Sequence, residues 1–79
     1  MNTKSKKPKA IAMAGVKSSQ VAEAGYDKDT KTLAVKFKSG GVYHYSGVEP
    51  VEHDRLMKAE SFGKFLQSNI VGKYKHRKI

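Results

Sequence analysis

The sequence predicts an α+β fold: a three-stranded antiparallel meander with two C-terminal helices packed on one face. Two alternating runs flank the Ser-Gly-Gly turn at residues 39–41, which is the pattern of a hairpin with one buried face. Two apolar stripes at helical spacing follow Pro50. With 79 residues, the chain is long enough for one small domain at most.

The three strands are expected at residues 21–26, 32–37 and 42–46. The first is weak, because Ala22 to Gly25 have low β propensity. The Asp-Lys-Asp-Thr turn at 27–30 follows, since short Asp side chains bond their own backbone. Leu33, Val35 and Phe37 then alternate with polar or small residues, so they should share one face of the second strand.

The length of the hairpin loop decides where Tyr43 and Tyr45 point. A two-residue loop places them beside Lys36 and Lys38, as an aromatic and basic platform. A three-residue loop with a glycine bulge places them in the core, on the face that carries Phe37. The polar neighbours of the tyrosines favour the second arrangement.

Short sequence signals predict where both helices begin and end. Pro50 suits a first helical position, and the acidic residues around it suit the positive end of the helix dipole. This helix is expected to end near Glu60, with His53, Leu56 and Met57 on one side. Ser61 is a natural N-cap for the second helix, and Gly72 is placed to end it. The buried stripe of the second helix comprises Phe62, Phe65, Leu66, Asn69 and Ile70.

The net charge of +9 is concentrated at the two ends of the chain. Residues 1–17 contain five lysines and residues 73–79 contain four basic residues, with no acid in either segment. We therefore expect an unstructured basic N-terminal arm (1–17), a neutral domain (18–72) and a basic C-terminal tail (73–79). Such a distribution suits polyanions, either nucleic acid or an anionic membrane or protein surface.

The sequence shows no sign of catalytic or metal chemistry. It has no cysteine, and its histidines and acids match no zinc, phosphate-loop or nucleophile spacing. We expect no enzyme activity and no cofactor, and interpret His53 as a structural residue. No apolar run is long enough to span a bilayer. We expect a cytoplasmic protein without a membrane partner, although Ala12-Met13-Ala14 faintly resembles a signal-peptide cleavage site.

An ordered set of short motifs resembles the KTSC domain family, named for its occurrence at the C-terminus of some lysyl-tRNA synthetases. The resemblance covers about residues 16–79 and includes the central Tyr-x-Tyr of Tyr43-His44-Tyr45. The other matching residues are Ser18-Ser19, Gly25-Tyr26-Asp27, Thr32-Leu33, Phe37, Val48, Ala59-Glu60-Ser61-Phe62-Gly63, Phe65, Ile70, Tyr74 and Arg77. His53 and Gln67 depart from the residues common in the family. The resemblance implies a small stand-alone bacterial or phage domain, for which RNA binding is the proposed role.

Two functions are consistent with these features. The first is non-catalytic binding of nucleic acid, preferably RNA, with flexible cationic ends neutralising phosphates and exposed tyrosines stacking bases. The second is docking on an acidic surface of a host protein. A solvated surface that serves solubility is the alternative explanation for individual lysines. The candidate binding residues are Lys36, Lys38, Tyr43, His44, Tyr45, Lys73, Lys75, Arg77 and Lys78.

Overall fold

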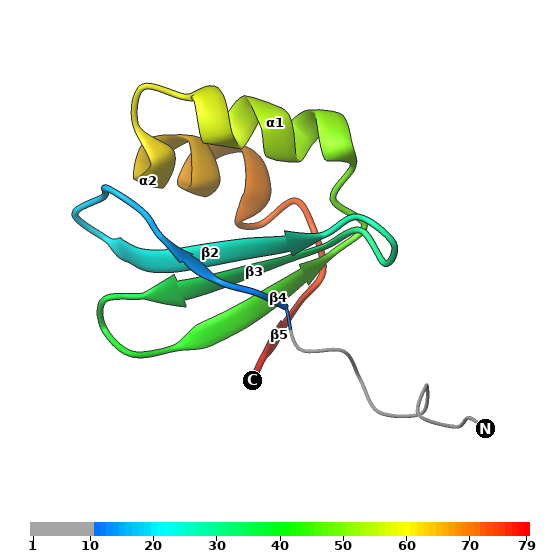
Figure 1. The fold of residues 1–79 in the computed structure, drawn as a ribbon, viewed down its shortest axis with the longest axis horizontal. Coiled ribbons are helices and arrows are strands. Elements are labelled where there is room, and N and C mark those ends of the chain that lie inside the picture. The colour runs from blue at the N-terminus through cyan, green and yellow to red at the C-terminus, as the bar shows by residue number, and fades with distance from the viewer. Residues whose placement is uncertain (1–10) are drawn as a thin grey trace.

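The computed structural model describes residues 11–79 and has two layers, a sheet and a pair of helices that cover one of its faces (Figure 1). The sheet contains five strands in the order β1-β2-β3-β4-β5, each antiparallel to its neighbours. The strands are β1 (Ala14–Gly15), β2 (Val21–Asp27), β3 (Thr32–Phe37), β4 (Val42–Ser46) and β5 (His76–Lys78). The helical layer consists of α1 (Pro50–Lys58), α2 (Phe62–Phe65) and the π-helical turn η2 (Leu66–Ile70). The predicted α+β class is confirmed, but the three-stranded meander gains one strand at each edge.

The turns form for the local reasons that the sequence indicates. Asp27 accepts a hydrogen bond from the amide of Asp29 at 3.0 Å, closing the β2–β3 turn. In the β3–β4 turn, the amide of Phe37 donates to the carbonyl of Gly41, and the amide of Gly40 donates to the carbonyl of Phe37, both at 2.9 Å. The loop is therefore the three residues 38–40, and Gly40 adopts the positive φ of 112° that the bulge needs. This loop turns both tyrosines toward the core face.

Both helices begin where the sequence predicts. Pro50 occupies the first turn of α1, and the hydroxyl of Ser61 accepts the amide hydrogen of Lys64 at 3.2 Å, capping α2. The amide of Val71 donates to the carbonyl of Leu66, the wide hydrogen bond that ends η2. Asn69 bonds the carbonyl of Phe65 through its amide nitrogen at 3.3 Å, as expected for a polar residue on a buried stripe.

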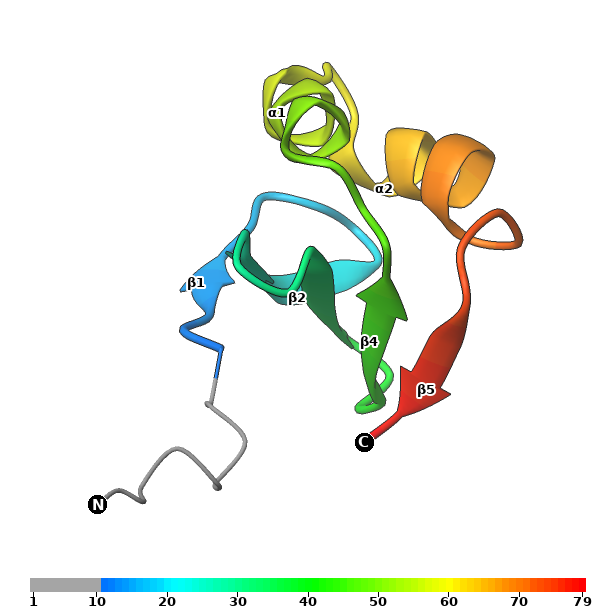
Figure 2. The same cartoon turned by 90° about the vertical axis from the view of Figure 1, so that its right-hand side faces the viewer.

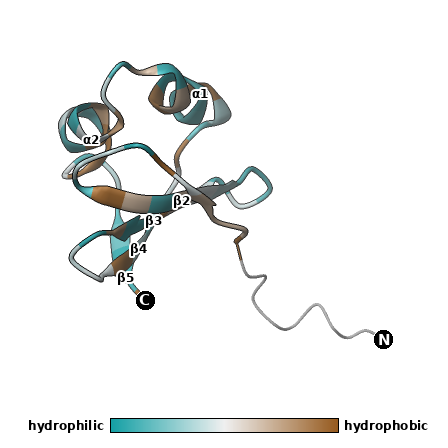
Figure 3. Ribbon diagram, turned by 60° about the vertical axis from the view of Figure 1, so that its left-hand side comes forward, coloured by the Kyte–Doolittle hydropathy of each residue, from teal (hydrophilic) through white to brown (hydrophobic). Residues whose placement is uncertain are grey.

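The core fills the space between the sheet and the helices. Figure 3 shows hydrophobic and hydrophilic residues alternating around the helices as the ribbon turns. Leu56 is the buried residue of α1, whereas Met57, which we expected on the same buried side, is 56% exposed. The fully buried side chains come from β2, β3, the β4–α1 loop, α1 and η2: Val21, Leu33, Val35, Val48, Leu56, Leu66 and Ile70.

The other face of the sheet is partly covered by the segment before β1, which crosses it obliquely (Figures 1 and 2). A Cβ atom on Gly25 would clash with the carbonyl oxygen of Ala12 and lie 3.0 Å from a methyl group of Ile11. Gly25 pairs with Ala34, which lies on this face and is 1% exposed. The expectation of an unstructured arm is therefore wrong for Ala14 and Gly15; its first ten residues lie outside the described part of the chain.

Candidate nucleic-acid interface

Three basic residues lie on the β3–β5 half of the face opposite the helices. The register pairs Ala34 with His44 and His44 with Arg77, so the last two lie side by side in one cross-strand row. Lys36 lies one row further along, opposite Val42. Lys36 and Arg77 are exposed and His44 is half-buried. We call Lys36, His44 and Arg77 the basic face.

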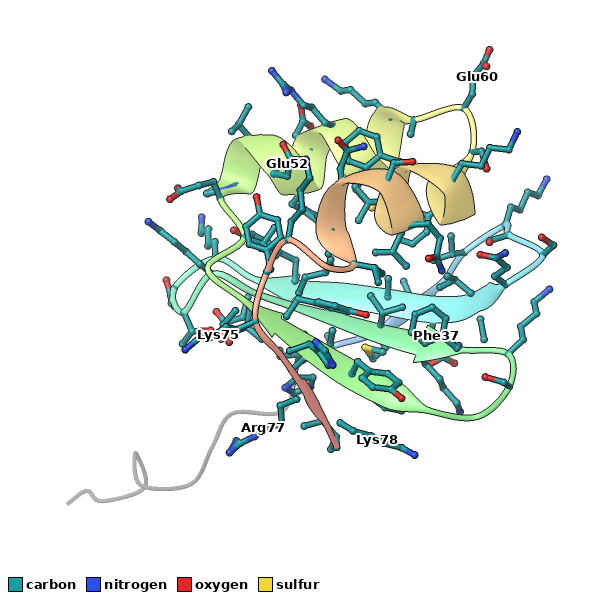
Figure 4. All side chains as sticks on the ribbon, turned by 180° about the vertical axis from the view of Figure 1, so that it is seen from behind. Phe37, Glu52, Glu60, Lys75, Arg77 and Lys78 are labelled. Atoms are coloured by element: carbon teal, nitrogen blue, oxygen red, sulfur yellow. The ribbon has the colours of Figure 1, made fainter. Side chains whose placement is uncertain are left out.

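The remaining predicted cations lie around the edge of this surface. Lys75 follows the same alternation as Arg77, and its carbonyl accepts the amide hydrogen of Ser46 at 2.9 Å. Lys78 pairs with Tyr43 and therefore points to the opposite side of β5 from Arg77. Figure 4 shows Arg77 and Lys78 directed away from the body of the domain. Lys38 occupies the β3–β4 turn, and Lys73 the turn after η2; both are exposed.

Tyr43 and Tyr45 do not join these cations as a stacking platform. Tyr43 pairs with Val35 and Tyr45 with Leu33, which places both rings on the helix-covered face. Tyr45 is 4% exposed, and burial, followed by the effect of Tyr43, raises the pKa of its hydroxyl. The ring of Tyr43 is half-buried and meets Phe37 edge to face, with centroids 5.7 Å apart. The arrangement with exposed tyrosines beside Lys36 and Lys38 is therefore wrong, because the three-residue loop sets the opposite register.

The C-terminal segment is a strand where we expected a free tail. His76–Lys78 pair with β4, and the amide of Ile79 donates to the carbonyl of Val42 at 2.8 Å. The ring of His76 lies 5.8 Å from the rings of both Tyr43 and Tyr45. Backbone pairing needs no apolar side chains, so a wholly polar segment can extend an open sheet edge. As a result, the backbone of Lys75, Arg77 and Lys78 has a fixed position beside β4.

The charge on the outer sheet face changes sign across the strands. Glu23 faces Lys36 across β2 and β3, and Asp27 ends β2, whereas β4 and β5 contribute only basic or neutral groups. Within residues 11–79, the ion pairs involve Lys31, Arg55 and Lys58 on the other elements. Within these residues, the cations of β3 and β5 therefore form no ion pair with a carboxylate, although Glu23 is the register partner of Lys36.

A second group of polar residues was missed by the sequence analysis. Ser18 to Gln20, Ser61, Lys64, Gln67 and Ser68 line one cavity, although they come from segments about 40 residues apart in the chain. No spacing rule connects such segments, so only their shared abundance of hydroxyl groups could have pointed to them.

His53 lines a cavity together with Tyr26 and the residues of the β2–β3 turn. Its ring stacks on Tyr26, with centroids 4.3 Å apart, and the cavity of about 500 Å³ also touches Asp27, Lys28 and Asp29. Burial lowers the pKa of the imidazole, and the nearby charge of Asp54 partly opposes this shift.

Residues 11–79 hold no cluster of three or more potential metal ligands. They also contain no helix long and apolar enough to cross a membrane.

These features define a small antiparallel α+β domain with a cationic edge strand. A sequence profile of the KTSC domain matches residues 17–74, so the chain belongs to the KTSC domain family. This confirms the resemblance found in the sequence.

Known proteins support this assignment at the level of both structure and sequence. The crystal structure of a KTSC domain protein from Yersinia pestis superimposes with a TM-score of 0.85 at 38% identity, covering 89% of this chain and 99% of that one. A protein of Tsukamurella paurometabola is 36% identical over 63 residues, covering 80% of this chain and 94% of its own length. A lysine–tRNA ligase of Nostoc punctiforme is 34% identical over 61 residues, 77% of this chain but 11% of the ligase.

Proposed function

We propose that this domain is a non-catalytic nucleic-acid-binding module of the cytoplasm, with RNA as its preferred ligand. The observation that carries the proposal is the pairing of β5 with β4. It fixes the backbone of Arg77 within the basic face, with Lys78 on the other side of the same edge strand and Lys75 just before it. Cations held on a rigid frame lose less conformational entropy on binding than cations on a free tail. These cations bind the phosphates of the ligand. Its bases cannot stack on Tyr43 and Tyr45, because both rings lie on the helix-covered face of the sheet.

RNA is favoured over DNA by the relatives. Two of the proteins to which this chain is similar are lysine–tRNA ligases, whose name includes an RNA. Single strands and loops suit a surface about three strands wide, because their phosphates can follow the curvature of a small domain. Without aromatic stacking, binding should depend mainly on charge and show little sequence preference.

The test is fluorescence-anisotropy binding of a single-stranded RNA between 50 and 300 mM salt. The full chain is compared with the triple variant Lys75→Gln, Arg77→Gln and Lys78→Gln. Each phosphate contact contributes about 0.7 to the slope of log affinity against log salt for single strands. The triple variant should therefore bind more weakly and lose about 2 from this slope.

A charge-matched control separates the edge strand from net charge. Lys28→Gln, Arg55→Gln and Lys58→Gln remove the same charge from the turn and helix side of the domain. This control should keep nearly the full slope. Equal losses in both triple variants, or no measurable affinity of the full chain for RNA or DNA, would refute the proposal.

Docking on an acidic host protein is the alternative outcome of the same set of experiments. A pull-down from lysate with and without nuclease distinguishes the two functions. A partner that survives nuclease treatment but is lost with the edge-strand triple variant would assign the cations of β5 to a protein surface instead.

A further inference from the structure

A polar groove lies between the β1–β2 loop and the start of α2. Its first part, about 320 Å³ in volume, is lined by four serines, two glutamines, Gly63 and Lys64. A second cavity of about 350 Å³ shares Ser19, Gln20 and Gln67 with it and extends to Lys38 in the β3–β4 turn. We call these two connected cavities the serine groove.

Two of the four serine hydroxyls in the groove are arranged as donors. Ser18 Oγ accepts the amide hydrogens of Gln20 and Val21 at 3.1 and 3.2 Å. Ser61 Oγ accepts that of Lys64 at 3.2 Å. A hydroxyl oxygen that accepts backbone hydrogens keeps its own hydrogen free to donate. Both serines therefore offer donors to a ligand while their positions are held by the backbone.

A glycine allows the two walls of the groove to approach each other. Gly63 is buried, and a Cβ atom there would lie 3.1 Å from Ser18 Oγ and 3.2 Å from Gln20 Oε1. The opposite end is fixed by the backbone, because the amide of Lys38 donates to the carbonyl of Gln20 at 2.8 Å. The β1–β2 loop is thus held against α2 at one end and against the β3–β4 turn at the other.

The charged residues that line the groove have one sign. Lys64 lines the first cavity and Lys38 the second, and none of the described residues lining either cavity is acidic. Hydroxyl and amide donors combined with ammonium groups match an acceptor-rich anion, and charge-assisted hydrogen bonds are the stronger ones. Phosphate oxygens have this chemistry, whereas a cation would find no carboxylate here.

We propose that the serine groove binds a phosphate group through the hydroxyls of Ser18, Ser61 and Ser68 and the ammonium group of Lys64. The phosphate belongs either to a small phosphorylated ligand or to the backbone of a nucleic acid. This site is on the helix side of the sheet, apart from the basic face, and its existence does not depend on the function proposed for the edge strand.

The test is an NMR titration of the full chain with inorganic phosphate, adenosine 5′-monophosphate and adenosine, at constant ionic strength maintained with chloride. Phosphate and the monophosphate should shift the amides of Ser18 to Gln20 and of Gln67 and Ser68 in a saturable manner. Adenosine should leave them unchanged. A single-stranded oligonucleotide that shifts the same amides and is displaced by inorganic phosphate would identify the nucleic-acid backbone as the source; shifts with the small ligands alone would identify a small ligand.

Two exposed residues allow the groove to be altered without disturbing the core. Lys64→Gln should weaken phosphate binding about tenfold, the loss expected for one charge-assisted hydrogen bond. Ser68→Ala, which keeps the charge, should weaken it about threefold, as for a neutral hydrogen bond. Lys58→Gln on α1 removes the same charge away from the groove and should have no effect. Absent or non-saturable shifts, or equal losses in the Lys58 and Lys64 variants, would overturn the proposal.

Discussion

Tyr26 and His53 stack face to face, with ring centroids 4.3 Å apart and planes inclined by 9°, and so join β2 to the first turns of α1. The hydroxyl of Tyr26 also donates a hydrogen bond to the carbonyl oxygen of Val48, a fully buried residue in the loop before α1. Burial, followed by the negative charges of Glu49 and Asp27, raises the pKa of this hydroxyl, which keeps it a donor. One aromatic residue thus holds both the loop and the helix that cover this end of the sheet.

Removal of the Tyr26 hydroxyl tests this role. Tyr26→Phe should lower the free energy of unfolding by about 1–2 kcal/mol, because the carbonyl of Val48 loses its partner in a buried setting while the ring stack persists. Urea denaturation followed by circular dichroism measures the loss. Tyr74→Phe is the matched control, since no hydrogen bond from the Tyr74 hydroxyl is found among residues 11–79, and this variant should change stability by less than about 0.5 kcal/mol.

The lowered pKa of His53 predicts that stability depends on pH in a defined window. Folding favours the neutral imidazole, so this contribution is complete above the unfolded pKa of about 6.5 and decreases as pH falls toward the lower folded value. The ionisable groups around the imidazole are Asp54 on α1, Tyr26 and Asp27 on β2, and Lys28 and Asp29 in the turn that follows β2. His53→Phe preserves a ring against Tyr26 but cannot be protonated.

The measurement is the urea midpoint at intervals between pH 5.5 and 7.5. The parent chain should lose stability toward the acidic end of this range, and His53→Phe should show a shallower dependence. Identical pH profiles for the two proteins would mean that the imidazole does not couple folding to protonation.

The contact between Gly25 and Ala12 predicts an asymmetric response to alanine substitution. Gly25→Ala places a methyl group against the carbonyl of Ala12, so the segment before β1 must move off the sheet, at a cost of about 1–3 kcal/mol. Gly15→Ala adds the same atom to β1 with no neighbour within 4 Å and should be nearly neutral. Thermal melting of both variants, with hydrogen exchange at Ala34, checks this. Equal melting temperatures would show that the packing of the segment before β1 on the sheet does not require glycine at position 25.

Truncation after Tyr74 distinguishes a structural strand from a free tail. The truncated chain loses the bonds from Ser46 to Lys75 and from Ile79 to Val42 and exposes Tyr43 and Tyr45 at the edge of the sheet. We expect a loss of at least about 1 kcal/mol, since each hydrogen bond contributes about 0.5–1.5 kcal/mol. The full-length triple glutamine variant keeps the backbone pairing and should stay near parental stability. Unchanged stability on truncation would argue for a tail that is not docked.

The parts of this protein that sequence determines by itself are those controlled by neighbouring residues. Ser61 caps α2 through an amide three residues away, and Gly40 supplies the positive φ of a three-residue loop, so both features have readable local signatures. The alternation of Tyr43 and Tyr45 with polar residues likewise favoured their burial. The loop geometry then settled which of the two possible registers forms.

Tertiary structure alone decided the two outer strands and the serine groove. β1 and β5 are short and exposed, and they form because an open edge offers backbone donors and acceptors to any segment that returns beside it. The groove unites the β1–β2 loop with α2 because Gly63 lets them approach. Backbone pairing and close approach depend on where distant segments lie in the fold. They therefore produce no periodic pattern in the sequence of the residues involved.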